Sequence, residues 1–236
     1  MTSKEVLAEL QSLGSESYKK LLMKNHGVKE PCFGVKIGDL KKIQKRIKTS
    51  RELALELYDS GNYDAMYLAG LIADDARMTR KDLQNWADKA YGGALAGATV
   101  AWVAAGSPHG WAMALKWIES SKGHVAAAGW CTLASLVALK PDSDLDLPAI
   151  KGLIERVEKR IQQEPDLIRY VMNDFIIAVG SYVKPLSKFA LETAEEIGPV
   201  KANLGCNQCE VPFAPEHIRK VEKKGETGKK RKMVKC

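Results

Sequence analysis

Residues 146–183 read DLPAIKGLIERVEKRIQQEPDLIRYVMNDFIIAVGSYV. Asp146 and Pro148 are typical of a helix N-terminus, because aspartate can cap free backbone amides and proline is tolerated in the first turn. Apolar residues then recur at helical spacing, and Pro165 opens a second run of the same kind. The apolar positions of the two runs are Ile150, Leu153, Ile154, Val157 and Ile161, then Leu167, Val171, Phe175 and Val179. The stretch therefore predicts two amphipathic helices joined by a short turn.

Similar start and stop signals recur along almost the whole chain. Thr2 to Glu5 has the form of a capping box, and Thr79 with Asp82 resembles it. Gly14 and Gly198 follow helical runs, where glycine commonly ends a helix. No strand hairpin is predicted. Further helices are expected after Gly14 from Ser15, from Thr49–Ser50 to about Gly61, and over residues 63–78, about 91–105, 108–120, 124–139 and 185–197.

Helix follows helix in pairs of about 35–45 residues, which is the period range of helical repeat solenoids. We therefore expect residues 1–198 to form an all-α superhelix of HEAT-like antiparallel helix pairs, an α-α solenoid. A compact, non-repeating helical bundle is the alternative. Residues 199–236 predict a C-terminal appendage with a short basic helix from Pro215 and a basic tail whose end is mobile. The appendage is expected to pack on the last repeats through Val211, Phe213, Ile218 and Val221.

The net charge of +7 favours an anionic partner, with nucleic acid ahead of a membrane surface. Nine Lys or Arg and two Asp or Glu stand between Arg219 and Cys236, so this tail alone carries a charge of +7. The body is then close to neutral. Binding by the body therefore requires a local basic patch.

The start of the chain lacks the basic flank and apolar run that are typical of a signal peptide. Five scattered cysteines, an odd number, agree with a reducing compartment. Residues 90–115 carry no Lys, Arg, Asp or Glu, but Ser107 to Gly110 interrupts them and most are Ala or Gly, so no membrane span is predicted. We expect a cytoplasmic monomer without a cofactor.

Several segments together resemble a known family. They read GVKEPCFGVKIGDLKKIQKRIK, YLAGLIADDARMTRKDLQNWADKA, VAWVAA, AAAGWCTLASLVALKPDSDLDL, RYVMNDFIIAVGSYVKPL and GKKRK. On these segments, which span most of the chain, the sequence resembles the AlkD-like DNA alkylation repair family of HEAT-like repeat proteins. The resemblance implies a solenoid whose concave basic face holds duplex DNA. It also implies glycosylase chemistry on cationic alkylated purines such as 3-methyladenine and 7-methylguanine.

The family's catalytic helix carries Trp-Trp-Asp, followed three residues later by a second Asp. The matching stretch here, residues 89–100, reads KAYGGALAGATV. Tyr91 stands at the first aromatic, and Gly92, Gly93 and Ala96 stand where the second Trp and both acids would be. A fixed carboxylate would stabilise the cationic, sugar-like transition state, and this stretch contains no acid. The resemblance therefore implies the family fold without its known catalytic set.

A later helix, where the family places another aromatic, offers Asp174 as the remaining candidate catalytic residue. A carboxylate at a groove could support glycosidic cleavage or orient water, whereas pairing with Arg169 would make it structural. The candidate groove aromatics and polar residues are Tyr91, Trp102, Trp130, Asn173 and Tyr182. Aromatic side chains can contact exposed nucleotides, but burial between helices is the commoner use of tryptophan.

The glycines of residues 89–100 raise a question of their own. Gly93, Gly97 and Ala101 stand at i, i+4 and i+8, which places them in a smooth stripe along one helix face. The stripe predicts close helix–helix packing. A groove opened for a DNA backbone or a bulky ligand is the alternative, because glycine permits close approach.

Two basic clusters are candidates for phosphate binding, and an ordinary solvated helix face is the alternative for each. Each neutralised phosphate would steepen the log–log salt dependence of binding by about 0.9. The first cluster is Lys41, Lys42, Lys45, Arg46 and Lys48, and the second is Arg156, Lys159, Arg160 and Arg169.

Cys206 and Cys209 have half the spacing of a zinc site, which His217 and Cys236 could complete. Unliganded thiols are favoured over zinc and over a thiol–disulfide role, because a single CxxC with irregular partners is a weak signal.

We therefore expect a DNA-binding HEAT-like protein that recognises or excises alkylated purines in duplex DNA. A non-enzymatic protein–protein scaffold is the alternative, since solenoids commonly hold peptides on a concave face. A concave face lined with Lys and Arg would favour DNA, and an apolar or acidic face would favour the scaffold.

Overall fold

The computed structural model describes residues 1–204 and 210–235. Helices make up all the regular structure in these ranges, and no strand occurs there. The α-helices up to the middle of the chain are α1 (Ser3–Leu13), α2 (Glu16–His26), α3 (Ile37–Ile47), α4 (Arg51–Asp59), α5 (Tyr63–Ile72), α6 (Arg80–Lys89), α7 (Gly92–Ala94) and α8 (Ala101–Gly106). The later ones are α9 (Gly110–Trp117), α10 (Gly123–Leu139), α11 (Leu147–Arg160), α12 (Asp166–Tyr182), α13 (Ser187–Ile197) and α14 (Ala214–Lys223).

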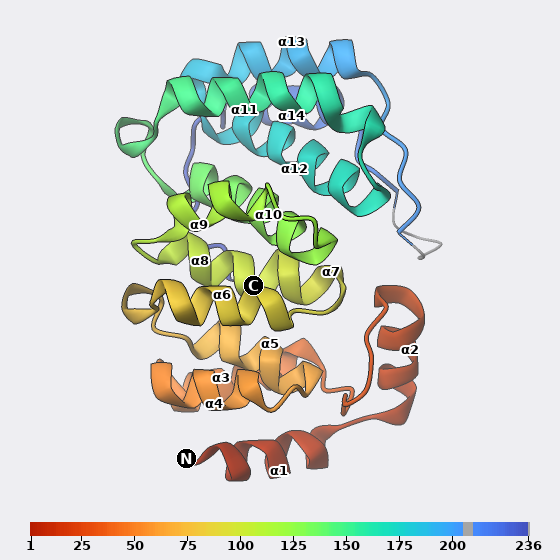
Figure 1. Ribbon diagram of the computed structural model, residues 1–236, viewed down its shortest axis with the longest axis vertical. Coiled ribbons are helices and arrows are strands. Elements are labelled where there is room, and N and C mark those ends of the chain that lie inside the picture. Colours follow the sequence, from red (N-terminus) through yellow and green to blue (C-terminus); the bar gives the residue numbers. More distant parts are fainter. Residues whose placement is uncertain (205–209, 236) are drawn as a thin grey trace.

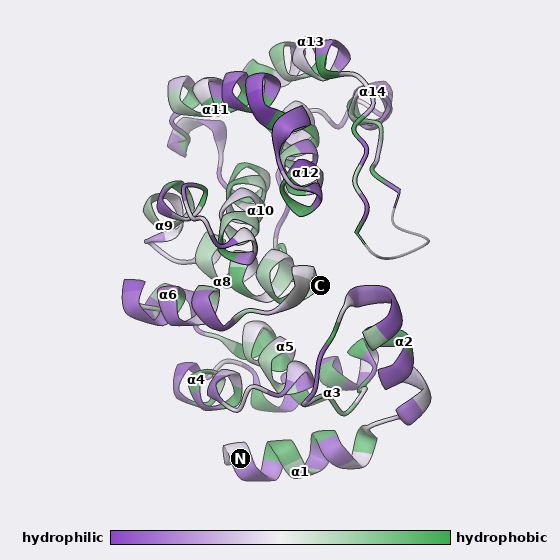
Figure 2. Ribbon diagram, turned by 45° about the vertical axis from the view of Figure 1, so that its right-hand side comes forward, coloured by the Kyte–Doolittle hydropathy of each residue, from purple (hydrophilic) through white to green (hydrophobic). Residues whose placement is uncertain are grey.

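The helices stack along the long axis of the molecule, with the N-terminal helices at one end and α11 to α14 at the other (Figure 1). Figure 2 separates them into columns. One column, the outer row, contains α4, α6, α9 and α11. The middle column, the inner row, contains α5, α7–α8, α10 and α12, while α2, α3 and α14 lie on the far side of it. The expected all-α fold of stacked helix pairs is confirmed.

Local capping signals set most helix boundaries as expected. The Thr2 hydroxyl accepts from the Glu5 amide while the Glu5 carboxylate accepts from the Thr2 amide, and Thr79 with Asp82 forms the same box. The Asp146 carboxylate accepts from the Ala149 amide at 3.0 Å and opens α11. These contacts satisfy backbone amides that have no partner inside the helix.

Two helices differ from the expectation. The helix expected over residues 63–78 ends at Ile72 and is followed by a 3-10 turn, Asp75–Arg77, because Ala73 takes an extended conformation. The helix expected over 91–105 contains a π-helical stretch, Leu95–Val100, between α7 and α8. A π turn inserts one extra residue into a helix, and such turns are frequent at functional sites.

Close helix packing uses glycines, but not the predicted ones. A Cβ on Gly70 would stand 2.7 Å from the Thr99 side chain, and one on Gly129 would stand 2.8 Å from the Ile118 amide nitrogen. Both distances are too short for real side chains. Gly70 and Gly129 therefore let neighbouring helices approach each other.

The prediction that Gly93 and Gly97 allow close helix–helix packing is wrong. A Cβ on Gly93 would find Leu167 at 3.6 Å, and one on Gly97 would find the Cys131 sulfur at 3.4 Å. These are ordinary or slightly tight contacts, and Gly93 is exposed. Only Ala101 of the stripe is fully buried. The two glycines therefore leave the helix surface open.

The C-terminal appendage packs on α12 and α13 through α14. Ile218 is buried against Gly180, as expected, whereas Phe213 is 37% exposed and does not anchor the segment. The described part of the tail is hydrogen-bonded to the repeats, although a mobile end was expected. The Gly228 amide donates to the Ser181 carbonyl at 2.9 Å, and the Arg231 amide donates to the Ala138 carbonyl at 2.8 Å. The division into 1–198 and 199–236 stays a prediction.

Within the described ranges, no helix combines the length and apolar character needed to cross a bilayer.

Candidate nucleic-acid interface

The middle of the inner row presents a surface of small side chains. Gly93 lies next to Leu167 of α12, and Gly97 lies next to Cys131 of α10. Cys131 in turn faces Asp174 of α12, whose charge helps to raise the pKa of the thiol after the larger effect of burial. We call these residues, Gly93, Gly97, Cys131, Leu167 and Asp174, the inner face.

The inner face is almost uncharged. Residues 92–106 contain no charged side chain, and residues 123–139 contain none apart from His124. Helix α12 contributes Asp166, Arg169 and Asp174, of which the first two pair with each other at 2.5 Å in the first turn. Arg169 is therefore not the partner of Asp174, and Asp174 is the one acidic residue among the five that form the inner face.

Asp174 has the environment of a proton-holding group. No described residue donates a hydrogen bond to the Asp174 carboxylate or forms an ion pair with it. Among the described residues of neighbouring helices, the titratable group that faces it is the Cys131 thiol of α10. Burial raises the pKa of the Asp174 carboxyl to about 7. It is thus partly protonated at neutral pH, which weakens its use as a fixed negative charge.

The two candidate aromatics in the first half of the sequence, Tyr91 and Trp102, belong to the N-terminal hydrophobic core or pack against it. Tyr91 is half-buried, and its hydroxyl donates to the Gly61 carbonyl at 3.3 Å. Trp102 is buried and meets the ring of Tyr67 edge-on, with 5.7 Å between ring centroids. Tyr91 can therefore be reached from solvent, but Trp102 serves the core.

The candidates of the second half are spread over different surroundings. Trp130 is 1% exposed and packs against Phe175, and Asn173 is 3% exposed and donates to the Pro212 carbonyl at 2.9 Å. Asn173 therefore holds the C-terminal appendage. Tyr182, at the end of α12, lies beneath the Arg231 guanidinium.

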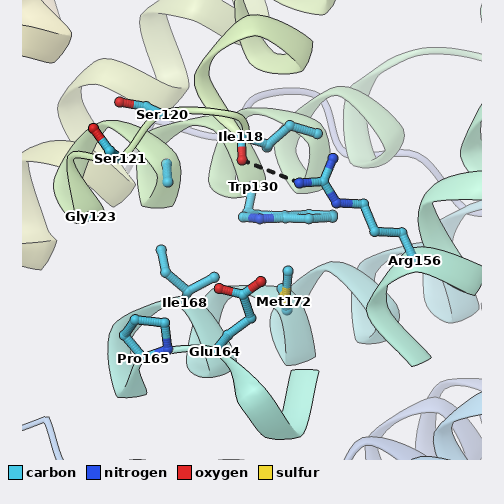
Figure 3. Close-up of a pocket in the computed structure, with 11 residues that line it drawn as sticks. Ile118, Ser120, Ser121, Gly123, Trp130, Arg156, Glu164, Pro165, Ile168 and Met172 are labelled. Atoms are coloured by element: carbon cyan, nitrogen blue, oxygen red, sulfur yellow. Dashed lines mark hydrogen bonds between the residues drawn. The ribbon is translucent and has the colours of Figure 1, made fainter. Parts of the chain in front are cut away.

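A cavity of about 220 Å³ lies beside Trp130, between the α9–α10 turn and the start of α12 (Figure 3). Arg156 covers one face of the indole, 5.8 Å from the ring centroid, and donates to the Ile118 carbonyl at 3.4 Å. Ile168 and Met172 lie on the opposite side. Because Arg156 is also paired with Glu119, its charge is committed to the packing of α11.

The first basic cluster lies on α3, on the side of the molecule away from the outer row (Figure 2). All five of its residues are exposed. Lys42 pairs with Asp39 at 2.8 Å and Arg46 pairs with Glu9 at 2.5 Å. Lys41, Lys45 and Lys48 have no acidic partner among the described residues.

This cluster extends into a larger basic element that the sequence reading did not identify. Residues 16–48, covering α2, α3 and the loop between them, contain ten Lys or Arg and three Asp or Glu, a charge of +7. Four further exposed lysines there have no acidic partner among the described residues, namely Lys20, Lys24, Lys29 and Lys36. We call residues 16–48 the N-terminal basic arm. A running charge count along the chain could have found it.

Asp64 fixes the loop that carries this arm. Its buried carboxylate accepts from the amides of Phe33, Gly34 and Val35 at 2.6, 3.1 and 2.8 Å. The Tyr63 amide also donates to the Pro31 carbonyl at 2.9 Å. The start of α5 thereby positions the segment that leads into α3.

The second basic cluster is divided between two places. Arg156, Lys159 and Arg160 belong to α11 in the outer row, where Lys159 and Arg160 are exposed, while Arg169 begins α12. The cluster therefore does not join the α3 cluster on one surface. Helix α14 lies on the same side of the inner row as α3 (Figure 2), and its Lys220 and Lys223, with the following Lys224, are exposed.

The predicted metal alternative falls mostly outside the described residues, because Cys206, Cys209 and Cys236 lie there. His217 is exposed on α14. The described part of the chain contains no group of three His, Cys, Asp or Glu that could hold a metal ion.

Similarity to known proteins identifies the family. The model of the DNA alkylation repair enzyme family matches residues 6–202. Two curated relatives are uncharacterized proteins, Lin0241 of Listeria innocua at 33% identity and Lmo0209 of Listeria monocytogenes at 32% identity. In both comparisons the match covers 94% of this chain and 97% of the relative.

A solved structure matches over the whole of both chains, with a TM-score of 0.90 and 37% identity. It is described as a new family of proteins related to the HEAT-like repeat DNA glycosylases with affinity for branched DNA structures. The helix pairs of the present fold thus have the HEAT-like arrangement that the sequence predicted. Over nearly its full length, the chain belongs to the AlkD-like DNA alkylation repair family.

Proposed function

We propose that this protein binds DNA whose path is branched or distorted, and that it recognises such DNA without excising alkylated purines by the family's usual chemistry. The observation that carries the proposal is the placement of two basic elements on one side of the inner row. The N-terminal basic arm lies at one end of that side and α14 at the other (Figure 2).

The two basic elements supply the cations that a DNA backbone requires. The N-terminal arm exposes seven lysines without acidic partners among the described residues, and α14 with the following Lys224 adds three exposed lysines. Neutralised phosphates release counterions, which supplies affinity that falls with salt. Two separated groups of phosphate contacts suit two duplex arms or one bent duplex better than a single straight groove.

The inner face, between the N-terminal basic arm and α14, suits a protein that recognises the shape of DNA and not its sequence. The inner face carries small side chains and one half-buried carboxyl, and it offers no Lys or Arg to a straight duplex lying directly on it. A solved relative is described as having affinity for branched DNA. We propose the same preference for this chain.

Absence of excision follows from the chemistry of the matching helix. Glycine and alanine stand where the family's second tryptophan and both acids would be, and the inner face retains only Asp174. A carboxyl whose pKa is about 7 is charged only part of the time at neutral pH, so it stabilises a cationic sugar poorly. Asp174 is the one residue to test if excision occurs.

The experiment compares a labelled four-way junction, a linear duplex of the same sequence, and that duplex with one 7-methylguanine. Binding is measured by fluorescence anisotropy at two salt concentrations, and released base is measured by chromatography in the same samples. We expect salt-dependent binding, tightest for the junction, and no released base. Base release would refute the lack of excision, and Asp174→Asn would then be the next variant.

A protein-binding scaffold is the second candidate, and the uncharged inner face favours it. Such a face could hold an apolar peptide, as solenoids commonly do. Failure to bind any of the three DNAs at low salt would exclude the DNA proposal and leave the scaffold.

A further inference from the structure

Residues 226–235 form a non-helical segment that returns along the molecule after α14. Gly228 donates to the carbonyl of Ser181 in the last turn of α12, and Arg231 donates to the carbonyl of Ala138 at the end of α10. Lys235 reaches the carbonyl of Ala73, directly after α5. The segment therefore passes the C-terminal ends of inner-row helices from one end of the fold toward the other.

Two lysine side chains of this segment bind backbone carbonyls at the C-terminal ends of helices. The Lys230 amine donates to the Val137 carbonyl at 2.8 Å and pairs with Asp142 at 2.7 Å. The Lys235 amine donates to the Ala73 carbonyl at 3.2 Å and pairs with Asp75 at 2.7 Å. Their side chains are only 18% and 14% exposed. Cations at these positions satisfy carbonyls that lack helical partners and complement the helix dipoles.

The backbone and apolar contacts agree with a fitted segment. Val234 packs against the core cluster of the N-terminal repeats. Gly228 has a φ of 83°, and a Cβ there would stand 3.0 Å from the Lys184 Cβ. The backbone at Gly228 therefore requires glycine. Further along the segment, the Arg231 guanidinium lies over the Tyr182 ring.

We propose that the C-terminal ends of the inner-row helices form a binding slot for an extended basic peptide, and that its occupant is this chain's own segment 226–235. In the slot the segment acts as a clasp. It joins α5, in an earlier repeat, to α10 and α12, which already pack directly on each other. Its buried lysines are structural and do not contact DNA.

One consequence rests on the proposed function. The N-terminal basic arm and α14 lie at opposite ends of the inner row, so a clasp along that row fixes the distance between them. Releasing the clasp is then expected to weaken junction binding even though no DNA contact is removed.

Hydrogen exchange of the full-length protein, followed by NMR without DNA, tests the clasp directly. We expect the Gly228 and Arg231 amides to be protected at least about tenfold relative to an unstructured peptide. The double variant Lys230→Met, Lys235→Met should lose most of that protection. The matched control is Lys232→Met, since Lys232 is exposed and has no partner among the described residues.

Unprotected Gly228 and Arg231 amides in the wild-type protein would overturn the proposal. Equal loss of protection in the double variant and in Lys232→Met would overturn it as well. If the double variant does not fold, Gly228→Ala disturbs the path of the segment without changing its charge, and the same two amides are followed. Because these measurements contain no DNA, their result is independent of the DNA-binding proposal.

Discussion

The Lys235 amine lies 2.7 Å from the Asp75 carboxylate, although the two residues are separated by 160 positions in the chain. This pair changes the interpretation of the net charge. The tail carries a charge equal to that of the whole chain, yet Lys230 and Lys235 are paired within the fold with the half-buried carboxylates of Asp142 and Asp75. The cations proposed to contact DNA are instead the exposed lysines of the N-terminal basic arm and those at α14.

Replacing α3 lysines should therefore change the salt dependence of DNA binding. Lys41→Ala with Lys45→Ala removes two exposed cations and should lower the log–log slope by about 2, at about 0.9 for each lost phosphate contact. Anisotropy titrations of the four-way junction at several salt concentrations measure the slope.

The matched control is Lys159→Ala with Arg160→Ala, which removes two exposed cations from α11 in the outer row. We expect its slope to equal that of the wild type. Equal losses in the two double variants would mean that binding responds to total charge and not to the N-terminal basic arm.

Two glycines of the central helices should differ in how strongly a methyl group at that position changes the stability of the protein. Gly129→Ala would place a Cβ 2.8 Å from the Ile118 amide nitrogen and 3.0 Å from the Ala114 carbonyl oxygen, both backbone atoms. We expect this variant to lower the free energy of unfolding by about 1–3 kcal/mol. Gly97→Ala meets only the Cys131 sulfur at 3.4 Å, so we expect a change within about 1 kcal/mol.

Urea unfolding of the two variants decides between the readings of the glycine stretch. If Gly97→Ala is as damaging as Gly129→Ala, the inner face is a packing surface after all.

The sequence predicted the features of the fold that depend on residues close together in the chain. The hydroxyls of Thr2 and Thr79 and the carboxylate of Asp146 cap helices within three residues of themselves, so their spacing alone predicts the boundaries. The recurrence of helix pairs predicted the solenoid in the same way. These features need no knowledge of distant parts of the chain.

Features built from distant residues left no such pattern. Lys230 meets the Val137 carbonyl 93 positions away, and the Asp64 carboxylate binds amides about 30 positions before it. Neither contact has a period or a motif. The burial of Trp130 and Asn173 could not be predicted for a similar reason, because composition does not say which face of a helix a neighbour covers.

Removing the Asp64 carboxylate should destabilise the protein strongly. Asp64→Ala leaves three loop amides without their acceptor, and each unpaired buried donor costs about 1–3 kcal/mol, so a loss of at least about 3 kcal/mol is expected. Asp64→Asn keeps one oxygen acceptor and should cost less. Urea denaturation measures both variants.

Asp59→Ala is the control for a lost carboxylate. Asp59 is exposed and pairs with Lys89 on the surface, so its removal should cost less than about 1 kcal/mol. Equal costs at Asp59 and Asp64 would contradict the role assigned to the loop amides.

Asp174 should make stability depend on pH in a direction opposite to that of a salt-bridged acid. Burial raises the pKa of its carboxyl from 3.8 to about 7, so the folded chain binds this proton more tightly than the unfolded chain. The free energy of unfolding should therefore fall as the pH rises from about 4 to about 7. The facing Cys131 thiol, whose pKa is raised by burial and by Asp174, stays protonated over this range.

Asp174→Asn removes this titration. Above pH 7 the variant should be more stable than the wild type by at least about 1 kcal/mol, and its stability should vary less between pH 4 and 7. Asp144→Asn, at an exposed carboxyl, should keep the wild-type profile. Thermal unfolding across this pH range separates the two cases, since identical profiles for the wild type and Asp174→Asn would mean that the carboxyl is solvated and free to act as a fixed charge toward DNA.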